Sequence, residues 1–233
     1  MKKKLFALAV CVAMLSAAIV GGTMAYFTDE DVQENTFTAG KVGIALDEAV
    51  VEADEVGNLV ATNERTSGDQ SYHLYPAQVV TKDPTITVDS DSEEAYVAAV
   101  INVTGDLYGL IGVDDAANID ITRLASGGLM AKTAEQVSDW NGLAMVYETE
   151  DCVIYQAAAE KEWTLYIFMK EAQAADAKIV LFDTLTIPAE WDNLEMEKIS
   201  GMKINVKAYA TQKVGFTDCY SAMTTAFASD FNF

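Results

Sequence analysis

The sequence predicts a mainly β protein: an antiparallel β-sandwich with a partly helical insertion, preceded by a cleavable signal helix. Most segments alternate apolar and polar residues with the two-residue period of a half-buried strand. These segments are short, and turn-forming residues separate them at the spacing expected of a sandwich. Hydrophobic residues make up 51% of the 233 positions, enough to build a sizeable core. We expect a signal peptide over residues 1–25 and one sandwich domain over residues 26–233.

The charge of the chain excludes one class of partner. Acidic residues outnumber basic ones by 36 to 15, which gives a net charge of −21. Such a surface repels phosphate backbones and anionic lipids. We therefore expect no nucleic-acid partner, and membrane contact only for the precursor.

The N-terminus has the parts of an export signal. Lysines at positions 2–4 precede an apolar run over residues 5–20. The small residues Thr23 and Ala25 then fit a signal-peptidase site with cleavage before Tyr26. A retained membrane anchor is the alternative, but the run is short for a span and ends in glycines rather than basic residues. We expect a secreted protein.

The first half of the exported chain reads as strands. Residues 37–46 alternate, although two glycines weaken the pattern. Residues 47–72 form either a long loop or a hairpin with its tip near residues 56–58. Two further strands, 84–89 and 95–103, flank the acidic turn DSDSEE. Both faces of 95–103 are apolar, which predicts a strand in the middle of a packed sheet.

Residues 106–151 do not continue the strand pattern and are interpreted as an insertion between strands. Thr133 is placed as an N-cap with Gln136 three residues later, a capping-box pattern that predicts a short helix. Two turn signals, Gly127-Gly128 and Asn141-Gly142, bracket that segment.

Strand patterns resume after the insertion, at residues 152–157, 162–170, 177–188 and 202–212. Pro188 ends the third because proline cannot donate to a strand ladder. Strict alternation in the fourth predicts a half-buried antiparallel strand. The tail, 221–233, is either a short helix or a frayed end.

Three stretches carry a family resemblance. The first holds Ala25, Tyr26, Phe27, Thr28 and Asp29, then Asn35, Thr36, Phe37 and Gly40. The second holds Pro76, Val80, Lys82, Ala95, Tyr96 and Val97, with Ala77 where a glycine is usual. The third holds Ala208, Tyr209, Ala210, Gln212, Gly215 and Phe216. On these residues the chain resembles the TasA/camelysin family of Gram-positive exported proteins, also known as alternate signal-mediated exported proteins. The insertion is not covered.

The resemblance implies a jelly-roll-like sandwich that forms fibres of the biofilm matrix or cell surface. A SipW-type signal peptidase would free the N-terminal segment, which would add as a strand to the next subunit. The expected partners are other copies of the chain, this peptidase, and an accessory or anchor subunit. Edge pairing of this kind is physically sound, because backbone hydrogen bonds supply affinity and alternate side chains set register.

Candidate side chains for this assembly strand are distributed along the N-terminal segment. The segment Tyr26–Asn35 is the better donor, whereas residues 37–46 are equally well explained as the first strand of their own domain. A binding module that shares the fold and never polymerises is the main alternative function. The candidate assembly side chains are Phe27, Val32, Phe37, Val42 and Ile44.

Catalysis and metal binding find little support in the sequence. Camelysin-type relatives have been described as metallo-endopeptidases, but a zinc protease needs three protein ligands, commonly two histidines one helical turn apart. His73 is the single histidine, so no catalytic residue and no cofactor are expected. Two acidic clusters are weak Ca²⁺ candidates without EF-hand spacing, and solvated turns explain them better. They comprise Asp89, Asp91 and Glu93, and Asp114 with Asp115.

Two cysteines remain after cleavage, Cys152 and Cys219. Export permits a disulfide, and two buried free thiols are the alternative.

Overall fold

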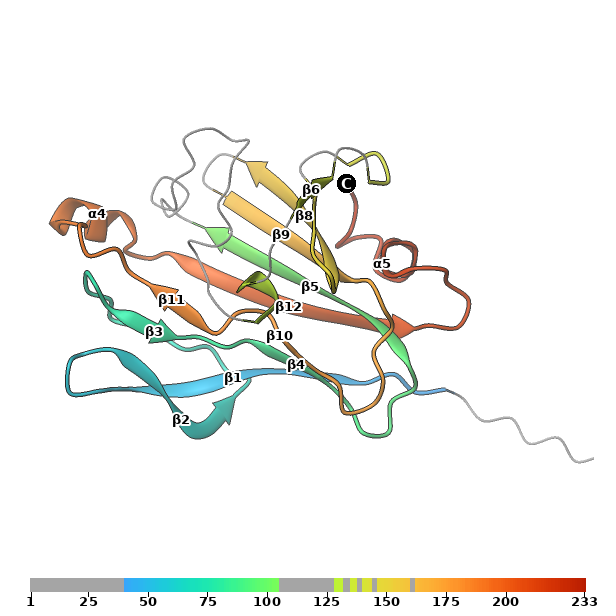
Figure 1. Ribbon diagram of the computed structural model, residues 1–233, viewed down its shortest axis with the longest axis horizontal. Helices are drawn as coiled ribbons and strands as arrows, with labels where there is room; N and C mark the ends of the chain where they lie inside the picture. The colour runs from blue at the N-terminus through green and yellow to red at the C-terminus, as the bar shows by residue number, and fades with distance from the viewer. Residues whose placement is uncertain (1–39, 105–127, 132–134, 138–139, 144–145, 160–161) are drawn as a thin grey trace, which may run out of the picture. The chain divides into compact units, whose positions relative to one another are not determined.

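A computed structural model describes residues 40–104, 128–131, 135–137, 140–143, 146–159 and 162–233 (Figure 1). All of them belong to one compact unit, Gly40–Phe233. Their strands form two sheets of six, which confirms the expected mainly β, sandwich-like architecture.

The first sheet has the order β10-β4-β1-β2-β3-β11. Its neighbours pair antiparallel, except that β2 and β3 meet in a short parallel contact, Leu59 beside Val80. The strands are β1 (Ile44–Ala53), β2 (Leu59–Thr66), β3 (Val79–Thr81), β4 (Thr85–Val88), β10 (Lys178–Val180) and β11 (Thr184–Thr186).

The second sheet has the order β12-β5-β9-β8-β7-β6, and every neighbouring pair is antiparallel. Its central strand β5 is apolar on both faces, as the sequence predicts. The strands are β5 (Ala95–Thr104), β6 (Glu135–Val137), β7 (Val146–Glu148), β8 (Cys152–Ala159), β9 (Glu162–Met169) and β12 (Lys203–Gln212).

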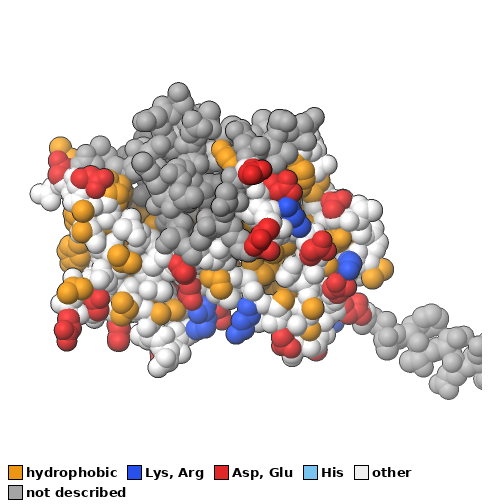
Figure 2. Space-filling view, in the orientation of Figure 1, with side chains coloured by type: hydrophobic (Ala, Val, Ile, Leu, Met, Phe, Trp, Pro, Cys, Tyr) orange, Lys and Arg blue, Asp and Glu red, His pale blue; other side chains and the backbone are white. Residues whose placement is uncertain are grey.

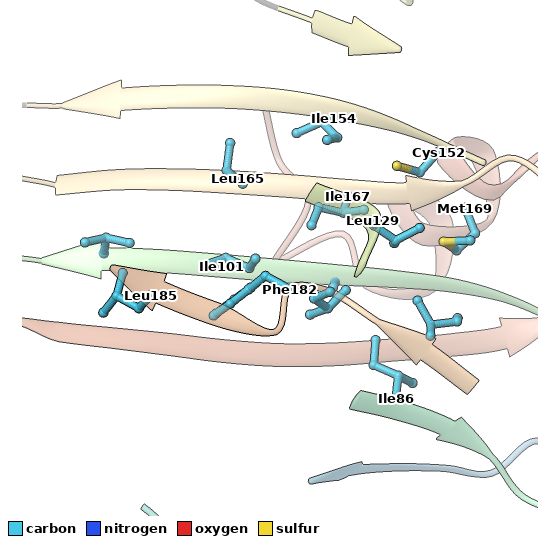
Figure 3. Packing of buried hydrophobic residues seen from close by; sticks show 14 of the residues in the cluster. Ile86, Ile101, Leu129, Cys152, Ile154, Leu165, Ile167, Met169, Phe182 and Leu185 are labelled. Atoms are coloured by element: carbon cyan, nitrogen blue, oxygen red, sulfur yellow. The ribbon is translucent and has the colours of Figure 1, made fainter. Parts of the chain in front are cut away.

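The main core lies between the two sheets. Alternate residues of β5, such as Val97 and Ile101, point into it and meet side chains of β4, β9 and β11. Figure 3 shows Ile86 and Leu185 on the first sheet, with Ile101, Leu165 and Ile167 on the second. A short 3-10 helix, η1 (Gly128–Ala131), adds the buried Leu129.

A second, smaller cluster covers the outer face of the second sheet. The other residues of β5, including Tyr96 and Ala98, pack there against α5 (Cys219–Ala226). Asp218 caps this helix, because its carboxylate accepts the amide hydrogen of Ser221 at 2.8 Å. The tail is therefore a capped helix rather than a frayed end.

The β1–β2 hairpin resolves the second open alternative. Its turn lies at residues 54–58, and the Asp54 carboxylate accepts the amide hydrogens of Val56 and Asn58 at 2.9 and 2.8 Å. Gly57 adopts φ +90°, a conformation that favours glycine. Residues 47–72 are thus a hairpin with its tip where the sequence placed it.

Two sequence-based element assignments are wrong. The capping box at Thr133 and Gln136 predicted a helix, but Glu135–Val137 forms β6 and pairs with β7. Pairing with an open sheet edge outweighs a local helix preference of a few tenths of a kcal/mol per residue. The predicted strand 177–188 is two strands, because β10 joins β4 whereas β11 joins β3.

Both cysteines are buried, and no disulfide joins them. Cys152 packs in the core between the sheets and Cys219 in the cluster beneath α5, on the opposite face of the second sheet. The Cys219 thiol lies 3.3 Å from the carbonyl oxygen of Val97, to which it donates a hydrogen bond.

Candidate functional site

The most accessible backbone edge of the domain belongs to β12. This ten-residue strand ends the second sheet, and within the described residues it pairs only with β5. The other outer strands, β6, β10 and β11, have three residues each. An unpaired edge presents alternate N–H and C=O groups that another strand can bind, and β12 is long enough to hold one.

The core-facing side chains of β12 are only partly buried along this edge. Residues such as Ile204 and Val206 face the core yet remain partly exposed. Lys203, Asn205 and Lys207 are exposed on the other face. Lysines on an edge strand oppose unspecific pairing with any apolar strand, so this edge favours an acidic partner.

A groove of about 890 Å³ runs beside the N-terminal half of this edge. One wall is β12 and the segment before it, Met196–Lys207. The other wall is the start of β1 and the loop 66–74. Leu46, Leu185 and Ile199 contribute apolar floor. The groove therefore combines an apolar floor with a free backbone edge, the two features that bind an extended segment.

Charged groups line part of the groove. The ammonium of Lys82 lies 2.5 Å from the carboxylate of Glu48, and both side chains are largely buried. The Lys82 ammonium also lies 5.6 Å from the ring centre of Tyr72. Burial, with the negative charge of Glu48, raises the pKa of Tyr72 above its ordinary value. Lys82 and Glu48 neutralise each other, and the remaining charged side chains of the lining are Lys203 and Lys207 on the β12 wall and Asp47 and Asp69 on the other wall.

The chain enters the domain at Gly40, against the acidic turn between β4 and β5. The amide of Glu93 donates to the carbonyl of Lys41 at 2.8 Å, and the amide of Asp89 donates to that of Gly43 at 2.9 Å. The Lys41 ammonium contacts both carboxylate oxygens of Asp91, at 2.7 and 2.6 Å. This turn fixes the point from which the N-terminal segment leaves the domain.

The same turn holds three of the Ca²⁺ candidates, Asp89, Asp91 and Glu93. The hydrogen bond from Lys41 and its positive charge lower the pKa of Asp91. Among the described residues, no group of three or more His, Cys, Asp or Glu side chains converges as a metal site would need. Asp114 and Asp115 lie outside the described residues.

Most of the residues proposed for cleavage and assembly also fall outside the described part of the chain. They are Thr23, Ala25, Tyr26, Phe27, Val32 and Phe37.

The structure does place Val42 and Ile44. Val42 is partly exposed just before β1. Ile44 begins β1, lies opposite Val88 of β4 and packs against the core. The structure therefore puts this end of residues 37–46 in a strand of its own domain, one of the two alternatives that the sequence left open. The donor role of the remaining residues stays a prediction.

Sequence reasoning missed the groove and the open edge. The signal was present in KINVKAYATQ, where Lys203 and Lys207 occupy the polar face of a strand next to the last turns of the chain. Lysines at alternate positions indicate an edge strand. The groove itself was hidden because its walls come from segments more than a hundred residues apart.

Comparison with known proteins identifies the N-terminal part. The family described as camelysin metallo-endopeptidase matches residues 1–68. The match includes the export-signal pattern, the segment that precedes Gly40 and the β1–β2 hairpin, so it confirms the resemblance over residues 1–68. No curated protein and no solved structure matches the chain.

The helices in the described part of the chain are all too short or too polar to cross a membrane. The family's description names an activity, metallo-endopeptidase. His73, the one histidine of the chain, lines the groove and lies edge-on to Tyr75 with ring centres 5.1 Å apart.

Proposed function

We propose that the mature protein is a secreted structural subunit of extracellular or cell-surface fibres, assembled by donation of a strand from one copy to the next. The observation that carries this proposal is the open ten-residue edge of β12 beside its groove. An edge of this length is a liability in a secreted monomer, unless a partner strand covers it.

The donor in this proposal is the segment Tyr26–Asn35 of another copy. It contains four acidic residues within six positions, Asp29, Glu30, Asp31 and Glu34. The acceptor edge exposes Lys203 and Lys207 beside the groove. Opposite charges on two strands favour the correct pairing and suppress others.

Cleavage before Tyr26 by a SipW-type signal peptidase would control assembly. Until cleavage, the donor segment stays attached to the signal peptide at the membrane. Afterwards it is free to pair. The family match over residues 1–68 supports this step, because it spans the signal pattern and the donor segment together. An accessory or anchor subunit would present the first free groove.

Donor and acceptor positions lie toward opposite ends of β12, which favours an open filament. The chain enters beside the C-terminal end of that strand, where the backbone amide of Lys213 donates to the carbonyl of Glu94. The groove flanks the N-terminal half of β12, and the whole strand is about 30 Å long. A head-to-tail contact of this kind generates a filament unless its rotation closes a ring.

Electron microscopy of the purified mature protein tests the proposal. We expect filaments from the chain that begins at Tyr26, and none from a variant in which Tyr26–Asn35 is replaced by ten Gly and Ser residues. Both proteins should be equally folded by circular dichroism, because the domain Gly40–Phe233 is unchanged. Filaments from the replaced variant, or a stable monomer from the unaltered one, would exclude strand donation. The second result would favour a non-polymerising binding module.

The camelysin family description motivates a second candidate, a metallo-endopeptidase. A zinc site with one histidine would need carboxylates or cysteines as its other protein ligands. Casein hydrolysis by the mature protein that EDTA abolishes and Zn²⁺ restores would support this activity. No hydrolysis after Zn²⁺ loading would exclude it.

A further inference from the structure

Exposed apolar side chains gather at the end of the domain formed by the β1–β2 hairpin tip. Seven large hydrophobic residues are exposed in the described part of the chain, and four lie here. We call them the tip patch. It consists of Val56 (82% exposed), Val60 (38%), Tyr75 (55%) and Val79 (37%). Figure 2 shows hydrophobic and acidic side chains interspersed at this end of the molecule.

Direct hydrogen bonds hold the two halves of the tip patch together. The Gln78 side-chain amide donates to the carbonyl of Gly57 at 2.7 Å. The amide of Val79 donates to the side chain of Asn58 at 3.0 Å. The segment that carries Tyr75 and Val79 is therefore fixed against the hairpin that carries Val56 and Val60.

A strained turn presents Tyr75. Ala77 adopts φ +64°, a left-handed conformation that costs free energy in any residue with a Cβ. Gln78 stabilises the turn, because its side-chain oxygen accepts the amide hydrogen of Tyr75 at 3.1 Å. Strained backbone conformations of this kind are concentrated at functional sites. A cluster of exposed apolar residues on a highly charged protein points to the same conclusion, an interaction site.

A matching apolar residue is exposed near the opposite end of the domain. Val214 is 75% exposed in the turn after β12. The preceding residue, Lys213, forms an ion pair with Glu94 at 3.0 Å, and Glu93 binds the backbone of Lys41. Val214 therefore lies close to the point where the N-terminal segment leaves the domain.

We propose that the tip patch of one copy packs against the Val214 turn of the next copy, as a second contact between fibre subunits. This inference rests on the proposed strand donation. A copy whose donor segment occupies the next copy's groove brings its own Val214 turn toward the mouth of that groove. The tip patch is continuous with the mouth, because Tyr75 contacts His73, which lines the groove.

Cysteine cross-linking of the mature chain tests this contact. Cys152 and Cys219 are buried, so they give a low background. Mild oxidation of a Val56→Cys, Val214→Cys double variant should link each copy to two neighbours and produce a ladder of trimers and longer species. Either single variant should stop at dimers. A matched double variant, Asn63→Cys with Val214→Cys, places one thiol at an exposed site away from the tip patch and should give no ladder.

The outcomes separate this contact from strand donation. Filaments without a ladder above the Asn63 control overturn the tip contact and leave strand donation standing. A ladder without filaments supports the tip contact and excludes strand donation. If neither filaments nor a ladder form, both the tip contact and strand donation are overturned.

An equilibrium measurement gives an independent test. A Val56→Ser, Tyr75→Ser variant should raise the critical concentration for polymerisation by about tenfold, because both substitutions remove apolar surface from the proposed contact. A tenfold change corresponds to about 1.4 kcal/mol of binding free energy. Leu194→Ser is the control, because Leu194 is 65% exposed but lies outside the tip patch. An equal effect of both variants would overturn the proposal.

Discussion

The backbone amide of Ala49 donates a 2.6 Å hydrogen bond to the carboxylate of Asp83 at the point where β1 changes partners. Residues 44–47 pair with β4, residues from Glu48 onward pair with β2, and the register with β2 shifts between Ala49 and Val51. Ala49 is 4% exposed, so its amide has no access to water. The Asp83 carboxylate therefore supplies an acceptor to a buried amide beside the irregularity in the strand.

Removing this carboxylate should destabilise the domain. We expect Asp83→Ala to lower the free energy of unfolding by about 2–3 kcal/mol, because a buried amide loses a charged acceptor. Urea denaturation followed by tryptophan fluorescence measures the change. Arg65→Ala is the control, since it leaves the Ala49 hydrogen bond in place and removes the partly exposed ion pairs of Arg65 with Asp83 at 2.7 Å and Asp47 at 2.8 Å, each worth about 1 kcal/mol or less. Equal losses in both variants would contradict the role assigned to the Ala49 hydrogen bond.

A close approach at Gly43 gives a second prediction. A Cβ at this position would lie 2.2 Å from a carboxylate oxygen of Asp89. We expect Gly43→Ala to cost about 1 kcal/mol or less, because the partly exposed Asp89 carboxylate can rotate away from the added methyl group. In the double variant with Asp89→Ala the cost should be smaller, which a double-mutant cycle detects. Gly68→Ala, at an exposed site, should change stability by no more than about 0.5 kcal/mol.

The strained turn at Ala77 predicts a stabilising substitution. Ala77→Gly removes the left-handed penalty of about 1–2 kcal/mol but adds flexibility to the unfolded chain. We expect a net gain of about 0.5–1 kcal/mol in the free energy of unfolding. Ala77→Val should be destabilising, because a β-branched residue tolerates positive φ poorly. A loss in the glycine variant would show that the turn adopts another conformation in solution.

Cys219 predicts a loss of stability in alkali. Burial raises the pKa of its thiol to about 12, whereas an unfolded chain has a value of about 8.5. The folded state thus favours the neutral thiol. Its contribution is complete below pH 8.5 and is lost as the pH rises toward 12. Thermal unfolding from pH 8 to 11 should show a steeper decline in the unaltered protein than in Cys219→Ala. Parallel curves would refute this assignment. The native thiol should also resist alkylation at pH 8.

The sequence was most informative where a strand's environment is set by its own residues. The apolar residues of 95–103 are buried on both faces of β5, and those of 202–212 pack on one face of β12, as their sequence patterns predict. Assignment failed at β6, because three residues gain strand structure only through β7. It failed again where residues 177–188 divide between two partners, a choice that no local pattern encodes.

The candidate site was less accessible to sequence reasoning for the same reason. The groove exists only because β12, the loop 66–74 and the start of β1 meet in space. The acidic donor segment and the alternating lysines were each visible in the sequence. Their proposed complementarity depends on the placement of Lys203 and Lys207 on β12, which among the described strands pairs only with β5.

That complementarity leads to a prediction about assembly. Reversing both charges with Lys203→Glu and Lys207→Glu should suppress filaments, because acidic side chains would then face the acidic donor segment. Lys178→Glu on β10 is the control, since it reverses an exposed charge outside the groove. Light scattering and electron microscopy measure the yield of filaments.

A compensating variant makes this prediction specific. Adding Asp29→Lys and Asp31→Lys to the reversed protein restores opposite charges between donor and edge, so filaments should return. The donor substitutions alone should suppress assembly, because they set lysine against lysine. The rescued protein has the same net charge as the unaltered chain, −21, so the donor variant alone is the control that separates strand pairing from net charge, because it is less acidic and should still fail to assemble. Failure of the rescue, with each protein folded by circular dichroism, would show that the donor segment binds elsewhere than along β12.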